Sequence, residues 1–258
     1  MTINPLYSLA GVLVGLLVGL TGVGGGSLMT PLLVLLFGFH PATAVGTDLL
    51  YAAATKSVGT TVHGWRGTVD WRVVRRLAIG SVPAALLTLG WLAQAGERTA
   101  ATGHVIAVML GVTLISSAIA TLFRHRLVGW LTARVGTAEG RRLALLTILL
   151  GAVLGVLVSV TSVGAGALGM TALLVLYPRH PLKSLVGSDI AHAVPLTLLA
   201  GIGHWLLGSV DLSLLLALLV GSIPGIVAGS LLASRLREGV LRPVLAVTLA
   251  IVGVRLLF

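Results

Sequence analysis

Cysteine is absent from this chain of 258 residues, and charged residues make up only 9% of it. Without cysteine the protein has no disulfides, no thiol nucleophile and no cysteine-bound metal. The shortage of charge excludes an ordinary soluble domain, in which about a quarter of the residues are charged. The His-Glu-x-x-His pattern of zinc proteases is missing, and neither glycine run continues into Gly-Lys-Ser/Thr as in ATP-binding loops. We therefore expect no catalytic residues, no metal site and no cofactor.

Apolar sequence fills the chain instead, since 57% of the residues are hydrophobic and recur in long runs along its whole length. Such runs are typical of helices that cross a bilayer, so the expected fold class is an all-α integral membrane protein. The net charge of +10 reflects 17 Lys and Arg against 7 Asp and Glu, and most of the basic residues stand in short segments between these runs. A nucleic-acid partner would need a basic face, so we interpret these residues as topology signals.

The two halves of the chain repeat one another. A shift of 141 residues pairs 12 identical residues within positions 45–83, and the matches include Asp48 with Asp189, Asp70 with Asp211, and His63 with His204. Internal repeats of this kind are typical of secondary transporters. The expected divisions are repeat one at 1–123, with a hairpin at 6–38 and spans at 41–65, 74–92 and 104–123; a basic cytoplasmic loop at 124–142; and repeat two at 143–258, with a hairpin at 143–177 and spans at 182–207, 212–233 and 241–258.

Each repeat begins with an interrupted apolar segment, broken at Thr21-Gly22-Val23-Gly24-Gly25-Gly26 or at Thr161-Ser162-Val163-Gly164-Ala165-Gly166. Pieces of about 15 and 12 residues reach only ~22 and ~18 Å, so we expect neither to cross a ~30 Å hydrocarbon core alone. The segment is either one broken span or a re-entrant hairpin. Hairpins place 14 Lys and Arg on one side and 2 on the other, which the positive-inside rule favours. Each half then crosses three times, which inverts the repeats, with both termini outside and the central loop cytoplasmic.

The two interruptions are candidate anion sites. A glycine turn leaves backbone N–H groups accessible, and the helix that follows directs its positive dipole end to the same place. The candidate substrate-binding residues here are Thr21, Gly22, Gly24, Gly25, Gly26 and Ser27, together with Thr161, Ser162, Gly164 and Gly166. Close helix packing is the alternative role for glycine, and it is the expected role of the series Gly11, Gly15 and Gly19 and of the pair Gly151 and Gly155.

Lys56 is the remaining candidate for substrate binding, because it falls inside a predicted span where a charge costs ~2.5–3.5 kcal/mol. It either faces the anion or extends its ammonium group to the inner interface. Its repeat mate is Thr197, so the charge is not symmetric.

Two aspartates and a histidine inside the spans are candidates for coupling or gating. Asp48 and Asp189 either cap locally broken helix or bind a coupling ion, and His192 is one turn from Asp189, close enough to pair with it. Asp70 and Asp211 directly precede apolar runs and are expected N-caps. His63 and His204, at span ends, are expected to be interfacial hydrogen-bonding groups.

As a set, these motifs resemble the sulfite exporter TauE/SafE family, also called the toluene sulfonate uptake permeases. The resemblance rests on Thr21-Gly22-Val23-Gly24-Gly25-Gly26-Ser27, Pro31, Val45-Gly46-Thr47-Asp48, His63, Gly67-Thr68-Val69-Asp70-Trp71 and Gly80-Ser81-Val82-Pro83, which the second half echoes. It implies transport of a small sulfur-containing anion, such as sulfite, a sulfonate or sulfoacetate, across a prokaryotic inner membrane, in an unspecified direction. The second interruption departs from the pattern because it has fewer glycines, and it would bind more weakly or serve as scaffold.

The leading hypothesis is a secondary transporter that holds its anion near the membrane midplane and works by alternating access. The alternatives are a passive anion channel, which should carry rings of charge, and a transporter of a small carboxylate or another inorganic anion. The expected partners are the anionic substrate and anionic lipids beneath the basic segment around Trp130. A homodimer is left open.

Overall fold

The computed structural model describes residues 5–21, 26–65, 69–96, 99–135, 138–233 and 238–258, and eleven helices account for most of these ranges. They are α1 (Pro5–Thr21), α2 (Gly26–Leu35), α3 (Pro41–Trp65), α4 (Trp71–Ala95), α5 (Ala100–Leu122), α6 (Arg124–Val135), α7 (Gly140–Thr161), α8 (Ala167–Leu176), α9 (Leu182–Leu206), α10 (Leu212–Ala233) and α11 (Glu238–Leu257).

Five helices in the described ranges, α4, α5, α7, α9 and α10, are long and apolar enough to cross a membrane. Large apolar side chains cover the outside of the molecule, and Leu87 and Leu206 are 76% and 81% exposed. Lipid tails accept such a surface, whereas water would drive it into an interior or an aggregate. The all-α integral membrane fold expected from composition is confirmed.

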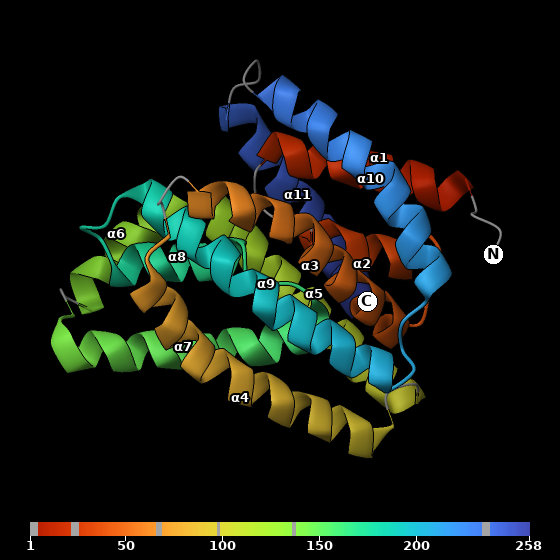
Figure 1. Ribbon diagram of the computed structural model, residues 1–258, viewed down its shortest axis with the longest axis horizontal. Helices are drawn as coiled ribbons and strands as arrows, with labels where there is room; N and C mark the ends of the chain where they lie inside the picture. The colour runs from red at the N-terminus through yellow and green to blue at the C-terminus, as the bar shows by residue number, and fades with distance from the viewer. Residues whose placement is uncertain (1–4, 22–25, 66–68, 97–98, 136–137, 234–237) are drawn as a thin grey trace.

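Helices α3 and α9 lie in the middle of the molecule, between an α1–α10 pair and an α4–α7 pair (Figure 1). They run in opposite directions, since Leu50 of α3 packs against Gly201 of α9 and Gly46 packs against His204. Helix α5 packs on α11. Each of these four pairs takes one helix from each repeat, so the two halves interlock.

Glycines allow the backbones of the two side pairs to touch. The contacts are Gly11 on Leu218 and Gly15 on Ser222 in α1–α10, and Gly151 on Leu77 and Gly155 on Ser81 in α4–α7. A Cβ atom at Gly15 or Gly155 would lie 2.5 Å from a carbonyl oxygen of the neighbouring helix, so a larger residue would separate the helices. The packing role expected of these glycines is confirmed, while Gly19 lies outside the described side chains.

Both interrupted segments are hairpins in shape. The rings of Tyr7 and Phe37 lie 5.1 Å apart edge to face, which brings the start of α1 next to the chain that leaves α2. Thr147 and Tyr177 share a hydrogen bond of 2.8 Å, which brings α7 next to the end of α8. Each interrupted segment therefore returns to the end of the molecule from which it started. That these hairpins enter a membrane and leave it on the same side stays a prediction.

Helix α7 is longer than the arms of about 15 and 12 residues expected at the first interruption. Its 22 residues extend ~33 Å, enough to cross a ~30 Å hydrocarbon core without a partner. The helix starts at Gly140, before the apolar run, because Arg141 and Arg142 are good helix formers that extend it past the hydrocarbon region. The 10 residues of α8 reach only ~15 Å, so the return arm is short as expected.

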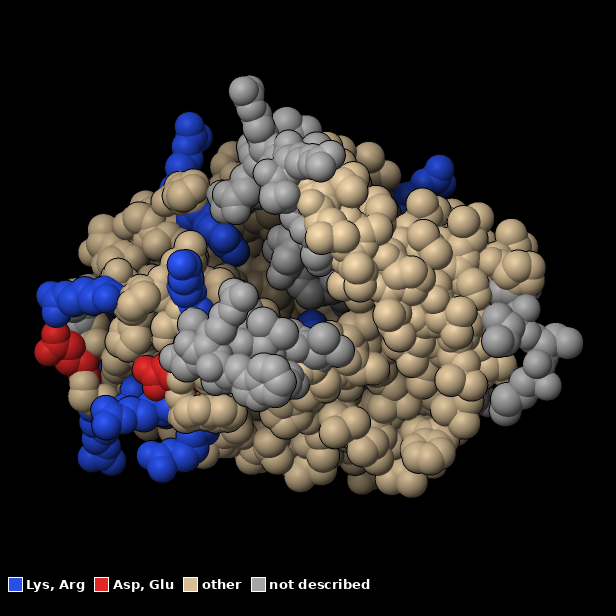
Figure 2. Space-filling view, turned by 45° about the horizontal axis from the view of Figure 1, so that its top comes forward, with Lys and Arg blue, Asp and Glu red and all other residues tan. Residues whose placement is uncertain are grey.

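Basic side chains gather at one end of the molecule, on the left of Figure 2. Arg76 of α4 donates a hydrogen bond to Tyr177 at 3.3 Å, and His180 lies 3.5 Å from Asp70, so the segment with Arg179 and Lys183 shares the end at which α4 starts. This is part of the grouping on which the hairpin interpretation depended; its other members, Arg235, Arg237 and Arg242, are not among the described side chains. The expected central loop is largely a helix, α6, in which Arg134 stacks 4.1 Å from the Trp130 ring.

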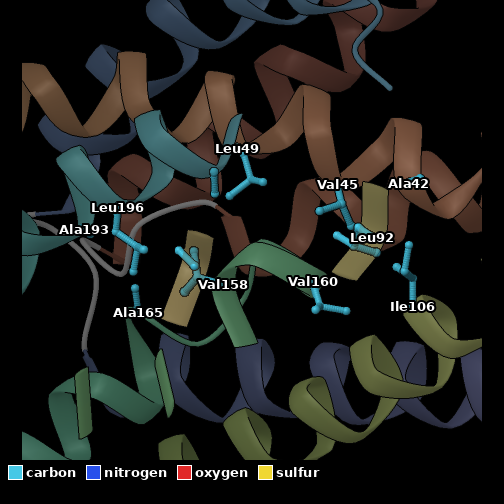
Figure 3. Packing of buried hydrophobic residues seen from close by; sticks show 12 residues of the cluster. Ala42, Val45, Leu49, Leu92, Ile106, Val158, Val160, Ala165, Ala193 and Leu196 are labelled. Atoms are coloured by element: carbon cyan, nitrogen blue, oxygen red, sulfur yellow. The ribbon is translucent and has the colours of Figure 1, made fainter. Parts of the chain in front are cut away.

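The buried core reaches into the second interruption. Ala165 belongs to the same apolar cluster as Ala193 and Leu196 of α9 and Val158 of α7 (Figure 3). The break in the hairpin is therefore packed against the central helix pair and excluded from the lipid surface.

Candidate functional site

The second break follows from the residues that end α7. The hydroxyl of Thr161 donates to the carbonyl of Leu157 at 2.6 Å and also accepts the N–H of Val163 at 3.2 Å, which replaces the next helical hydrogen bond. Ser162 then takes a left-handed conformation, with φ of 59°, and caps the helix. Gly164, with φ of 123°, completes a turn that a residue with a Cβ atom would strain.

Four consecutive backbone N–H groups, those of Gly164, Ala165, Gly166 and Ala167, donate no hydrogen bond to any described residue. They stand at the start of α8, and its N-cap residue Gly166 has no side chain to satisfy them. Ala165 and Ala167 are at most 5% exposed. Buried N–H groups are rarely left unpaired, and those at a helix start favour an anion.

Asp48 lies inside α3 and reaches across to the first hairpin. Its Oδ2 accepts hydrogen bonds from the hydroxyl and the backbone N–H of Thr30 in α2, at 2.5 and 3.2 Å. Its Oδ1 makes no hydrogen bond with a described residue. The hydroxyl of Ser162, at the second break, faces this carboxylate without a well-aligned hydrogen bond. Asp48 thus lies where the first return helix meets the second break.

Asp189, the repeat mate of Asp48, lies inside α9 against α8. Its Oδ1 is 2.9 Å from the point where a Cβ atom of Gly169 would stand, so a side chain at position 169 would force this carboxylate to move. No hydrogen bond joins this carboxylate to another described residue. Thr171, which corresponds to Thr30, instead donates to the carbonyl of Ala167 at 2.7 Å. The two aspartates therefore have different surroundings.

Lys56 lies between the two carboxylates. The antiparallel contact of Leu50 with Gly201 places Asp189 roughly one and a half helical turns beyond Lys56, and Asp48 lies roughly two turns before it. The ammonium group interacts electrostatically with both, and more strongly with Asp189, yet it forms no ion pair with a described residue. The side chain is half-buried. Figure 2 shows a hollow in the middle of the molecule with Lys or Arg surface at its bottom.

The structure thus brings several predicted site residues together. The second break connects Ser162, beside Asp48, to Gly169, beside Asp189, and the unpaired N–H groups lie between these two points along the chain. Lys56, in α3, interacts electrostatically with both carboxylates, Asp48 in its own helix and Asp189 in α9. Backbone donors and a cation therefore converge on one region, which can hold a small oxyanion.

The first interruption falls largely outside the described residues, which exclude Gly22, Gly24 and Gly25. Thr21 is the last residue of α1, and Gly26 and Ser27 begin α2, but their side chains are not among those described. Their predicted binding role stays a prediction. The same holds for the hydrogen bonding of His63.

Some roles predicted for polar residues were wrong. Asp48 and Asp189 cap no broken helix, because α3 and α9 run continuously past them. His192 does not pair with Asp189, and its Nε2 lies 2.8 Å from the Ser81 hydroxyl of α4 instead. His204 is a hydrogen-bonding group as expected, with the Ser159 carbonyl at 2.8 Å, but it is buried rather than interfacial.

Asp70 and Asp211 are N-caps as predicted, since each carboxylate accepts a backbone N–H from the helix that follows. Sequence reasoning missed what holds these caps in place. The N–H of Asp70 donates to Ser188 of α9 at 2.8 Å, and the N–H of Asp211 donates to Thr47 of α3 at 3.1 Å. Thr47 and Ser188 are repeat mates directly before Asp48 and Asp189. The available signal in the sequence was this repeated hydroxyl side chain.

The described residues contain no group of three or more His, Asp or Glu side chains that could hold a metal ion. The polar groups around the second break are the backbone N–H donors, the Ser162 hydroxyl and the carboxylates of Asp48 and Asp189, and Lys56 interacts electrostatically with both carboxylates. The N–H donors and the ammonium group suit an anion.

The profile of a family described as sulfite exporter TauE/SafE matches residues 7–256 of this chain. The probable membrane transporter protein YjnA of Bacillus subtilis (strain 168) is 40% identical over 253 residues, which cover 96% of this chain and 98% of that protein. The probable membrane transporter protein YdhB of the same strain is 28% identical and covers 95% of this chain and 97% of its own length.

A third relative, the probable membrane transporter protein MJ0441 of Methanocaldococcus jannaschii, is 24% identical and covers 80% of this chain and 74% of its own length. No solved structure gives a significant match. The similarity to these proteins runs through both repeats.

Proposed function

Because the chain belongs to the sulfite exporter TauE/SafE family of membrane transporters, we propose that it is a secondary transporter of a small sulfur-containing anion, such as sulfite, a sulfonate or sulfoacetate. The observation that carries the proposal is the row of buried, unpaired N–H groups from Gly164 to Ala167, with Lys56 in the same region of the fold. A sulfonate or sulfite group offers three oxygens that accept hydrogen bonds from several donors at once.

Two physical effects favour an anion at this place. Hydrogen bonds in which one partner is charged are roughly twice as strong as neutral ones, so an oxyanion gains more from the N–H groups than water does. The ammonium group of Lys56 also lowers the cost of placing a negative charge in the membrane interior. The Ser162 hydroxyl, close to this region, supplies a further donor.

Alternating access is the proposed mechanism. The four main helix pairs join one repeat to the other, so a change in their packing moves the repeats relative to each other. At the glycine contacts of α1–α10 and α4–α7 the backbones meet without side chains between them, so no glycine side chain has to disengage during such a movement. The anion would stay beside the crossing of α3 and α9 while access changes from one end to the other.

The basic end of the molecule gives the proposed orientation, with this end in the cytoplasm and both termini outside a prokaryotic inner membrane. Helix α6 would lie on anionic lipid there, since Trp130 and Arg134 present an aromatic ring and a guanidinium group together.

Counterflow into proteoliposomes tests the proposed function. Purified protein is reconstituted into vesicles loaded with unlabelled anion, and entry of labelled sulfite, thiosulfate, sulfoacetate, taurine or sulfate is measured against protein-free vesicles. We expect counterflow with at least one sulfur-containing anion and no single-channel currents. Counterflow with none of them would contradict the proposal, and channel currents would replace alternating access with a pore.

A further inference from the structure

The two central aspartates differ in what surrounds their carboxylates, although they occupy equivalent places in the two repeats. From this asymmetry we propose that Asp189 binds one proton that is transported together with the anion, while Asp48 stays ionised and fixes the first hairpin. The inference rests on the proposed function and names the coupling ion that drives it.

Asp48 is built to hold a negative charge. Two donors from Thr30, its hydroxyl and its backbone N–H, converge on Oδ2 of Asp48. Charge-assisted hydrogen bonds of this kind offset much of the free energy that burial of a carboxylate costs. Protonation would weaken the contact that joins α2 to α3.

Asp189 lacks such donors among the described residues. Its neighbour on α8 is Gly169, which has no polar side chain, and Thr171 is turned towards its own helix. A buried carboxylate without donors is tolerated when a cation balances it or when it carries a proton. Asp189 can therefore change its charge without breaking a hydrogen bond of the fold.

Charges on the neighbouring elements determine when this happens. Helix α3 contributes Lys56 and, further away, Asp48, while α6 contributes Arg124. Helix α4 contributes the hydroxyl of Ser81, which lies against His192, and its N-cap Asp70, whose N–H donates to Ser188. Helices α7 and α8 present Leu154 and Gly169. Asp189 interacts electrostatically with both Lys56 and Arg124, and more strongly with Lys56.

Competition for Lys56 couples the two solutes. Without the anion, the ammonium group balances the charge of Asp189. When the anion binds at the Gly164–Ala167 donors, Lys56 balances the anion instead, and Asp189 is left without its main counter-charge. Binding of one proton at Asp189 restores neutrality when the anion is monovalent, and it removes one of the two excess negative charges when the anion is divalent. The anion and the proton then bind together and leave together, so they move in the same direction.

Sulfoacetate and thiosulfate are suitable probes because both keep a constant charge between about pH 6 and 8. Proteoliposomes carry a trapped pH-sensitive dye, and the membrane potential is clamped at zero. We expect anion uptake to acidify the vesicle interior, and an imposed gradient of one pH unit to accumulate the anion about tenfold, as coupling to one proton requires.

Asp189→Asn imitates the protonated side chain. It should keep counterflow within about threefold of the wild-type rate and lose both acidification and accumulation. Asp48→Asn, the matched variant in the other repeat, should keep acidification. Acidification by Asp189→Asn, loss of its counterflow while it remains folded, or loss of acidification in Asp48→Asn alone would each overturn the assignment. Should Asp189→Asn not be recovered from the membrane, Asp189→Glu must shift the pH dependence of uptake, and an unchanged profile overturns the proposal.

These outcomes are separate from failure of the proposed function. Wild-type protein that shows no counterflow with any anion of the panel contradicts transport itself. Wild-type protein that shows counterflow without proton movement leaves transport intact and removes only the coupling.

Discussion

The side chain of Thr30 donates a hydrogen bond of 2.5 Å to Oδ2 of Asp48, and the backbone N–H of Thr30 donates a second one to the same oxygen at 3.2 Å. This contact joins the return helix of the first hairpin to the central α3–α9 pair. The equivalent residue of the second repeat, Thr171, bonds within its own helix. The two hairpins therefore have the same shape but differ in their hydrogen bonds to the central helices, although the threonine and the aspartate are present in both repeats.

Thr30→Val should destabilise the protein by about 1–3 kcal/mol, because it removes a donor from a buried carboxylate without changing the volume of the side chain. Thr171→Val is the matched control and should cost less than ~1 kcal/mol, since only a bond to its own helix is lost. The thermal midpoint of unfolding in detergent measures both. Equal losses in the two variants would show that the hydrogen bond to Asp48 adds no stability beyond that of a bond within a helix.

Lys56→Met should leave the folded protein in the membrane and abolish counterflow, because it keeps the apolar length of the side chain and removes the charge that faces the anion. Lys56→Arg should give an intermediate loss, since the guanidinium group is wider and flat. Lys183→Met, which changes the other lysine of the chain in the first turn of α9, is the control and should transport normally. Normal uptake by Lys56→Met would leave anion binding to the backbone donors alone.

Gly80→Ala should destabilise the α4–α7 pair by more than ~2 kcal/mol, because its Cβ atom would collide with the backbone carbonyl of Ile148. Gly90→Ala, in the same helix, meets no atom within 4 Å and should stabilise the protein by up to ~1 kcal/mol. Both are measured as shifts in the unfolding midpoint. A stabilising effect at Gly80 would contradict the packing described here.

Ser162→Gly should weaken anion binding about tenfold to a hundredfold, because a hydrogen bond to a charged group contributes about 1.5–3 kcal/mol. The fold should be preserved, since glycine accepts the φ of 59° at this position more readily than serine does. Affinity is measured by equilibrium binding of labelled sulfoacetate to purified protein. Unchanged affinity would place the bound anion away from the hydroxyl of Ser162.

Cysteine accessibility tests the orientation, and the chain offers a clean background because it has no native cysteine. Arg134→Cys in α6 and Lys183→Cys in α9 should both react with a membrane-impermeant maleimide only from the cytoplasmic side. A reporter that is active only in the cytoplasm should work when fused within 128–138 and fail after Phe258. Labelling of the two cysteines from opposite sides would restore the broken-span topology.

The helical membrane fold and the repeats were predictable because they depend on local properties of the chain. Apolar runs determine which helices can face lipid, and Asp70 and Asp211 stand directly before the helices that they cap. The hairpin shape followed from charge, since Arg179 and Lys183 had to join the basic end. The lengths of α6 and α7 were less predictable, because charged helix formers such as Arg141 extend a helix beyond its apolar run.

By itself, the sequence determined which residues interrupt or carry charge within the apolar runs: the two interruptions, Lys56 without a symmetric partner, and the repeated aspartates. Only the tertiary structure decided what each of them contacts. Asp48 meets Thr30 while Asp189 meets Gly169, and Ser188 holds the cap of the other repeat. The physical reason is that the sequence shows only which positions are polar. Which hydrogen bonds form between helices distant in the sequence depends on how closely their backbones approach.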